Sequence, residues 1–142
     1  MTIDFLNGYL KAMEEVNHRT NHGYTFEMRK MEDKHDLHAS IIDAFTFQGV
    51  TDVLGYKPCS KETLIKAINY WFFEKENETK GEKSIDEDDQ TQAFVQHLFQ
   101  FLSDDVQIYE LESECGVFFM YCTNFVFVGS DSMYALELGV ND

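Results

Sequence analysis

The chain has 142 residues, of which 44% are hydrophobic and 15% aromatic, and its 26 acidic and 11 basic residues give a net charge of −15. One domain of this length and apolar content buries a substantial core, which argues against global disorder. The charge disfavours direct binding of nucleic acid or of an anionic membrane, because both carry charge of the same sign.

The first predicted element is a helix from Thr2 to about Asn17. Its apolar residues recur every three or four positions, and Thr2 is suited to cap the first turn. Residues 21–23 (Asn-His-Gly) predict a break. Residues 24–31 then alternate between apolar and polar side chains, which is typical of a half-buried strand.

The middle of the chain predicts a further strand, a loop and the clearest helix. The β-branched and aromatic residues of segment 39–48 favour a strand, and residues 49–58 are expected to form a loop with at most one helical turn. Ser60 is expected to cap a helix over about 61–77, since apolar side chains line one side of that segment. Residues 77–90 contain almost no apolar side chain and predict a solvent-exposed acidic connection.

Residues 88–103 predict a third helix, with acids in its first turn that suit the positive end of the helix dipole. Four short strands follow, separated by turn-like residues. The expected strands are 106–112, 116–122, 125–129 and 133–138, with turns at 113–116, 123–124 and 129–132. Connections this short imply antiparallel hairpins. The order of elements predicts a single α+β domain over residues 1–142, with an antiparallel sheet of about 4–6 strands packed against about three helices.

The N-terminal residues lack the basic and apolar regions of a signal peptide, and no apolar stretch is long enough to span a membrane. The three cysteines, Cys59, Cys115 and Cys122, are odd in number and form no Cys-x-x-Cys motif. These observations predict reduced thiols in a cytoplasmic protein.

Two pairs of histidines have a spacing that would allow them to bind a metal ion from a helix. One pair is His18 and His22, with Glu14 and Glu15 just before it. The other pair is His35 and His38. The first helix is expected to end near His18, which takes His22 off its face, and no second Glu-x-x-His motif completes a two-metal site. We therefore expect neither a metal nor another cofactor.

Motifs for nucleophilic catalysis are missing from the chain. Cys59 lies at the start of the predicted helix 61–77, where a thiolate is stabilised, but the sequence supplies no base close to it. Cys115 falls in an acidic turn, and Cys122 falls in an apolar strand. No nucleophile elbow, phosphate loop or dinucleotide fingerprint occurs. The sequence predicts a protein that is not an enzyme.

The charge is unevenly distributed, because all Lys and Arg residues fall between Lys11 and Lys83. Residues 1–83 hold 14 acids against 11 bases, a net charge of −3, whereas residues 84–142 hold 12 acids and no base, a net charge of −12. A solvated surface normally mixes both signs, since neighbouring opposite charges relieve repulsion. A surface that faces a basic partner explains this segregation better than chance or a general acidic bias.

The most specific acidic cluster follows the third predicted helix. Glu110 and Glu112 share one face of their expected strand, while Tyr109 and Leu111 point to the opposite, core-facing side. Five acids within residues 104–114 are therefore expected to cluster at one rim of the sheet, with no Lys or Arg to balance them. The predicted partner-binding residues are Asp104, Asp105, Glu110, Glu112 and Glu114, together with Asp86, Glu87, Asp88 and Asp89.

The chain is small and acidic, has no catalytic motif, and ends on a predicted strand with the tail Tyr-Ala-Leu-Glu-Leu-Gly-Val-Asn-Asp (134–142). In these general features it resembles bacterial toxin-immunity proteins of the polymorphic-toxin or contact-dependent inhibition kind. The resemblance implies a cognate basic partner in the cytoplasm, typically a nuclease domain whose active site is occluded. An alternative is a DNA-mimic regulator that binds a basic host protein. A small metal-binding protein or enzyme is a third reading.

Overall fold

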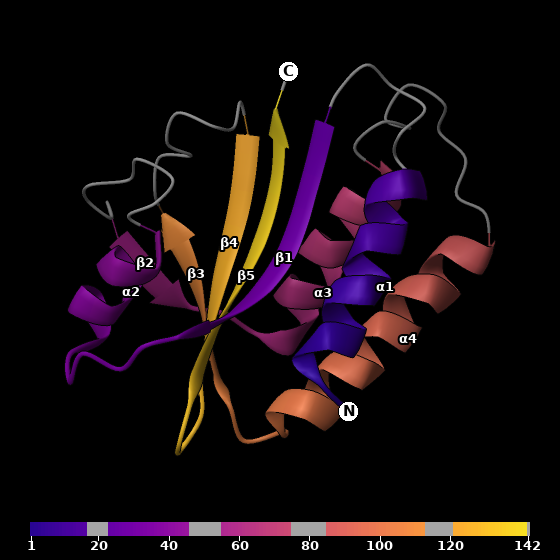
Figure 1. The fold of residues 1–142 in the computed structure, drawn as a ribbon. Coiled ribbons are helices and arrows are strands. Elements are labelled where there is room, and N and C mark those ends of the chain that lie inside the picture. The colour runs from indigo at the N-terminus through magenta and orange to yellow at the C-terminus, as the bar shows by residue number, and fades with distance from the viewer. Residues whose placement is uncertain (17–22, 46–54, 75–84, 113–120, 142) are drawn as a thin grey trace.

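The computed structural model describes residues 1–16, 23–45, 55–74, 85–112 and 121–141 (Figure 1). The helices are α1 (Ile3–Val16), α2 (Leu37–Phe45), α3 (Lys61–Asn69), which continues as the π-helical turn η2 (Tyr70–Glu74), and α4 (Ile85–Leu102). The strands are β1 (Gly23–Met31), β2 (Gly55–Pro58), β3 (Gln107–Glu112), β4 (Tyr121–Val128) and β5 (Met133–Asn141). None of the helices in these ranges is both long and apolar enough to cross a bilayer.

The strands form one five-stranded antiparallel sheet in the order β1-β5-β4-β3-β2. Strands β3, β4 and β5 follow one another along the chain, whereas β1 joins from the N-terminal side and pairs along its whole length with β5, from Gly23↔Asn141 to Met31↔Met133. The predicted α+β class with an antiparallel sheet is confirmed.

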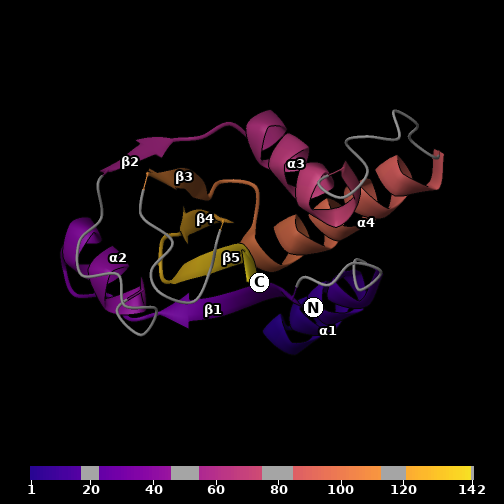
Figure 2. The same ribbon diagram turned by 90° about the horizontal axis from the view of Figure 1, so that it is seen from above.

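Helices cover both faces of the sheet (Figures 1 and 2). Helices α1, α3 and α4 pack on one face over the larger core, whose fully buried aromatic side chains include Phe26, Phe72, Phe94, Phe125 and Phe127. Helix α2 packs on the other face over a smaller cluster that includes Ile41, Phe45, Leu111 and Val126. The alternation of side chains along each strand supplies both cores.

The strand predicted over 39–48 is wrong, because residues 37–45 form helix α2. Ile41 and Phe45 lie four residues apart and are both buried against the sheet, which is the spacing of one helical face. The Asp36 carboxylate accepts a hydrogen bond from the amide of Ala39, capping the first turn. Packing and capping therefore outweigh the strand propensity of the β-branched residues.

The prediction of a loop over 49–58 is wrong for its last four residues, because residues 55–58 form β2. This edge strand pairs with β3 from Gly55↔Glu112 to Pro58↔Tyr109. Proline is tolerated there because an edge strand leaves half of its amides unpaired. Residues 46–54 lie outside the described part of the chain.

The turn predicted at Thr123 and Asn124 is wrong, since β4 runs through both residues. They pair with Leu138 and Glu137 of β5. The Thr123 hydroxyl accepts a hydrogen bond of 2.9 Å from Nε1 of Trp71, which fixes it on the core side of the sheet. The predicted strand 125–129 and the end of 116–122 are thus one strand, and residues 113–120 lie outside the described residues.

Other predicted elements are confirmed with shifted ends. The Ser60 side chain accepts a hydrogen bond from the Thr63 amide at the start of α3, as expected for an N-cap. Helix α4 begins at Ile85, so the last part of the predicted connection 77–90 is helical. Its earlier part and the end of the predicted helix 61–77 lie outside the described residues.

Strand β1 is an edge strand, and α1 satisfies the backbone groups that its free side exposes. The side chain of Asn7 accepts a hydrogen bond of 2.8 Å from the Met28 amide and donates one of 3.0 Å to the Met28 carbonyl oxygen. The Glu14 carboxylate accepts one of 2.7 Å from the Phe26 amide. Side chains of α1 therefore occupy the edge at which another strand would otherwise pair.

We expect Asn7→Ala to lower the free energy of unfolding by about 1–3 kcal/mol, because both backbone groups of Met28 lose their partner in a half-buried place. Urea unfolding measures the loss, and amide hydrogen exchange locates it. Exchange should quicken at Met28 and not at Phe26, whose acceptor is Glu14. Equal quickening at both amides would contradict a local role for Asn7.

Candidate functional site

Of the predicted acidic rim, the common face of Glu110 and Glu112 on β3 is confirmed. Glu110 is half-buried and Glu112 exposed, on the same side of the strand as Ile108 of the larger core. Tyr109 and Leu111 point to the other side and pack with the cluster beneath α2. Glu114 lies outside the described residues.

The acids of this rim have lysine neighbours that the sequence separates from them. Lys57 of β2 lies opposite Glu110 in the strand register, and its Nζ is 3.7 Å from Oε1 of Glu112. Nζ of Lys61 lies 3.8 Å from Oδ1 of Asp104. The expectation that no Lys balances the rim is therefore wrong, because β2 and the start of α3 bring lysines beside it.

The rim is also divided by the strand itself. Asp104 and Asp105 follow the end of α4, just before β3 begins at Gln107, whereas Glu112 lies at the far end of β3. Six residues of strand span about 17–20 Å, so the two groups do not form one cluster. Asp86, Glu87, Asp88 and Asp89 lie in the first turns of α4, about 20–24 Å from its other end at ~1.5 Å per residue. Of these four side chains only that of Asp89 is described, and it is exposed.

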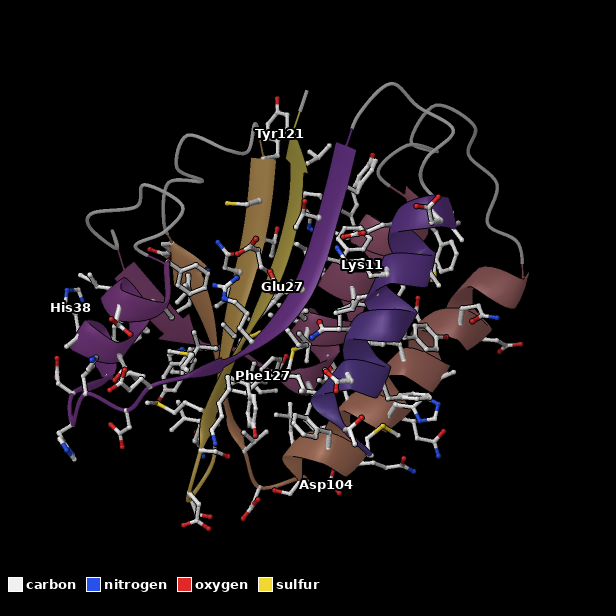
Figure 3. All side chains as sticks on the ribbon, in the orientation of Figure 1. Lys11, Glu27, His38, Asp104, Tyr121 and Phe127 are labelled. Carbon is white, nitrogen blue, oxygen red and sulfur yellow. The ribbon has the colours of Figure 1, made fainter. Side chains whose placement is uncertain are left out.

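A different set of acids lies on the connections at one end of the sheet, where β3 and β5 begin and β1 and β4 end. The strand pairings Gln107↔Val128, Val128↔Met133 and Met31↔Met133 bring three connections to this end. Besides Asp36, which caps α2, the exposed acids on these connections are Glu32, Asp33, Asp104, Asp105 and Asp131, and we call these five the acidic end. Figure 3 shows Asp104 there, beside the end of α4.

The acidic end is only partly neutralised. Glu32 lies 3.3 Å from Nζ of Lys34, and Asp104 keeps 88% of its side chain exposed despite the contact with Lys61. Asp33 accepts a hydrogen bond from the backbone of His35, and Asp105 accepts one from the Ser103 hydroxyl. Sequence reasoning found the two acids after α4 but missed the other members, because only strand pairing places them together.

The other charged group of interest is buried beneath α2. Glu137 of β5 is 2% exposed, and its Oε2 accepts a hydrogen bond of 2.7 Å from Nη1 of Arg29 on β1. Arg29 also donates to the Ala44 carbonyl oxygen at 3.0 Å and lies 5.2 Å from the ring centre of Phe45. Burial raises the pKa of the Glu137 carboxyl, and Arg29 opposes that rise.

Asn124 adjoins this ion pair on β4. It lies opposite Glu137 in the strand register and is 2% exposed. Its Nδ2 lies 3.6 Å from Sγ of Cys122, and its Oδ1 accepts no hydrogen bond from any residue that the structure describes. The cluster is compact and polar, and α2 covers part of it.

The cysteines differ in their chemical state. Cys122 is disulfide-bonded, so the expectation of three reduced thiols is wrong for this residue. Cys59 is a free thiol whose pKa is raised by burial and by the nearby carboxylate of Glu110, so its position before α3 does not produce a stabilised thiolate. Cys115 lies outside the described residues.

Of the histidines singled out in the sequence, His35 and His38 are described, whereas His18 and His22 are not. His38 stacks loosely on Tyr56 of β2, with ring centres 6.4 Å apart. Within the described ranges no group of three or more His, Cys, Asp or Glu side chains is arranged to hold a metal ion.

Comparisons with protein-family models, with curated proteins and with solved structures found no match to this chain. The physical features of the surface are therefore the basis for assigning a function.

We expect Arg29→Met to lower the free energy of unfolding by roughly 3–5 kcal/mol, because it leaves the buried Glu137 carboxylate without its partner. The loss should grow with pH. A carboxyl whose pKa is higher in the folded than in the unfolded state favours folding when protonated, so stability falls as the pH rises from the unfolded pKa through the folded one. Removing Arg29 raises the pKa of Glu137 in the folded state further, so stability falls over a wider range of pH.

Urea unfolding at several pH values between about 4 and 8 measures this slope. The double variant Arg29→Met/Glu137→Leu is the matched control, since it removes both charges and should recover most of the stability and lose the added slope. A single variant with the wild-type pH dependence would contradict the role given to Arg29.

Proposed function

We propose that the protein is an inhibitor of the toxin-immunity kind, which binds a basic protein domain through the acidic end and blocks it by occlusion. The observation that carries this proposal is that five exposed acids lie on three short connections at one end of the sheet. Their backbone positions are set by strand pairing, so the charge is presented on a preorganised surface. Preorganised charge accelerates association with a partner of opposite sign.

The distribution of lysines supports the choice of the acidic end over the β3 rim. At the rim, Lys57 lies close to both acids, so a basic partner would have to displace it. At the acidic end, Lys34 and Lys61 contact Glu32 and Asp104, but the exposed carboxylates of Asp105 and Asp131 form no ion pair with any residue that the structure describes. Exposed ion pairs are weak, which leaves the carboxylates accessible to a competing cation.

Occlusion suits a chain whose described residues present acids and no metal-binding group. A nuclease domain that acts on nucleic acid needs a cationic surface, and a protein with a net charge of −15 is attracted to it. Rapid capture is useful for neutralising a toxin, and electrostatic steering acts mainly on the association rate.

The test begins with the wild-type protein immobilised in an extract of the source organism, from which a basic partner is captured and identified. Association with the purified partner is then measured by stopped flow across salt concentrations. The variant Asp104→Lys/Asp105→Lys/Asp131→Lys should associate more slowly by about tenfold or more at low salt and with a weaker salt dependence. Its dissociation rate should change less.

The control variant is Glu15→Lys/Asp43→Lys/Asp89→Lys, which makes the same change in net charge at three exposed acids away from the acidic end. If both variants slow association equally, only net charge matters and the acidic end is not the site. If the wild-type protein captures no basic protein, the proposed function itself is wrong.

A further inference from the structure

Three aromatic side chains gather on the α2 side of the sheet, next to the edge strand β2. Tyr56 lies opposite Leu111 of the smaller core cluster in the strand register and is 36% exposed. His38 is exposed in the first turn of α2, and Tyr109 of β3 is half-buried. The ring centre of Tyr56 lies 5.7 Å from that of Tyr109 and 6.4 Å from that of His38. We call these three residues the aromatic patch.

The fold makes little use of the Tyr56 ring. Tyr56 belongs to neither core cluster, in contrast to Tyr109, which packs against the smaller one. Strand β2 is the last strand of the sheet, so no strand of the sheet pairs with its outer side. Aromatic rings that remain in water while they contact one another are typical of the anchoring residues of protein interfaces.

The charge around the aromatic patch is negative. The alternation of side chains sends Lys57 of β2 to the other face of the sheet, where its Nζ is 3.7 Å from Oε1 of Glu112. Arg29 is also on the α2 side, but it lies on β1 at the opposite edge of the sheet and is paired with Glu137. The charged side chains that precede His38 in the connection from β1 are Glu32, Asp33, Lys34 and Asp36. Three acids and one base leave this border with an excess of negative charge.

Helix α2 carries one further acid, Asp43. It lies five positions after His38, which is about 140° around the helix at ~100° per residue. Asp43 therefore lies on a different side of α2 from the aromatic patch. The acids that border the patch belong to the connection before α2, and two of them are members of the acidic end.

The connection from the acidic end to the aromatic patch is tied to α2 by hydrogen bonds. The buried Ser40 hydroxyl accepts one of 2.9 Å from the Lys34 amide and donates one of 2.8 Å to the Asp36 carbonyl oxygen. The Asp33 carboxylate accepts one of 2.7 Å from the backbone amide two residues later. These bonds fix the position of Asp33 relative to His38, so the acidic end and the patch form one continuous surface.

Strand β3 provides a second link between the two. Tyr109 follows Asp105 by four positions, which is at most about 13 Å of extended chain. A partner domain seated on the acidic end therefore reaches the aromatic patch without leaving the surface.

We propose that the aromatic patch anchors an arginine side chain of the basic partner, an inference that rests on the proposed function. A guanidinium is planar and less strongly hydrated than an ammonium, and it stacks on aromatic faces. The rings of Tyr56 and Tyr109 meet at 86° and form a corner. A guanidinium that lies on one of these rings can donate its N–H groups to carboxylates at the border.

The two surfaces then divide the work of binding. Exposed carboxylates act mainly on the association rate, because their field extends into solution. A side chain packed against aromatic rings acts mainly on the dissociation rate, because the contact exists only in the complex.

Two small cations test the patch without the partner. N-acetyl-arginine amide and N-acetyl-lysine amide carry the same charge, and each is added to fluorotyrosine-labelled protein at constant ionic strength up to about 100 mM, since one side chain binds weakly. The fluorine signal of Tyr56 should move at least about twice as far with the arginine compound as with the lysine compound. The signal of Tyr121, an exposed tyrosine at the other end of the sheet, is the control and should not discriminate (Figure 3). Equal responses of Tyr56 to both compounds would overturn the inference.

Dissociation of the captured partner tests the patch in the complex. Tyr56→Leu should raise the dissociation rate by about five- to tenfold, while the salt dependence of association stays that of the wild type. Tyr56→Phe restores the ring and should recover the wild-type dissociation rate to within about twofold. Tyr121→Leu makes the same change at an exposed tyrosine away from both surfaces and should leave both rates unchanged. Thermal unfolding checks that each variant is folded.

These outcomes separate the inference from the function on which it rests. If the triple-lysine variant of the acidic end associates slowly but Tyr56→Leu dissociates like the wild type, the inhibitor function stands and the anchoring role of the patch is wrong. If Tyr56→Phe dissociates as fast as Tyr56→Leu, the hydroxyl and not the ring makes the contact, which also contradicts the inference. Capture of no basic protein overturns the function and the anchoring role together.

Discussion

The buried ion pair between Arg29 and Glu137 is the interaction on which the arrangement of this fold depends. It joins β1 to β5, two strands more than 100 positions apart in the sequence, and its donor also binds the carbonyl oxygen of Ala44 in α2. A carboxylate inside a sheet is unfavourable without a partner. Because its partner is on β1, the pairing of β1 with β5 and the position of α2 over the sheet are stabilised together.

This pairing decides where the charges of the chain meet. With β1 beside β5, the connection after β1 lies next to the turn between β4 and β5, and the turn after α4 reaches the same end. The acidic end is thus assembled from connections separated by up to about a hundred residues. The same topology places Lys57 beside the acids of β3, so a rim that lacks lysine in its own part of the sequence has one in space.

The sequence by itself determined the elements whose signal is local. The apolar spacing of α1, the Ser60 cap of α3 and the alternation in β1 each depend on neighbouring residues, and each was predicted within a few positions. The common face of Glu110 and Glu112 was predictable for the same reason, since alternation along a strand needs no partner.

Only the tertiary structure decided the features that depend on distant residues. Ile41 and Phe45 form a helix because a sheet face receives them, and Thr123 extends a strand because Trp71 and β5 bind it. The acidic end required the strand order, and the neighbours of each acid required the positions of Lys57 and Lys61. Charge in a sequence is counted along the chain, but its effect depends on distance in space, which long-range strand pairing sets.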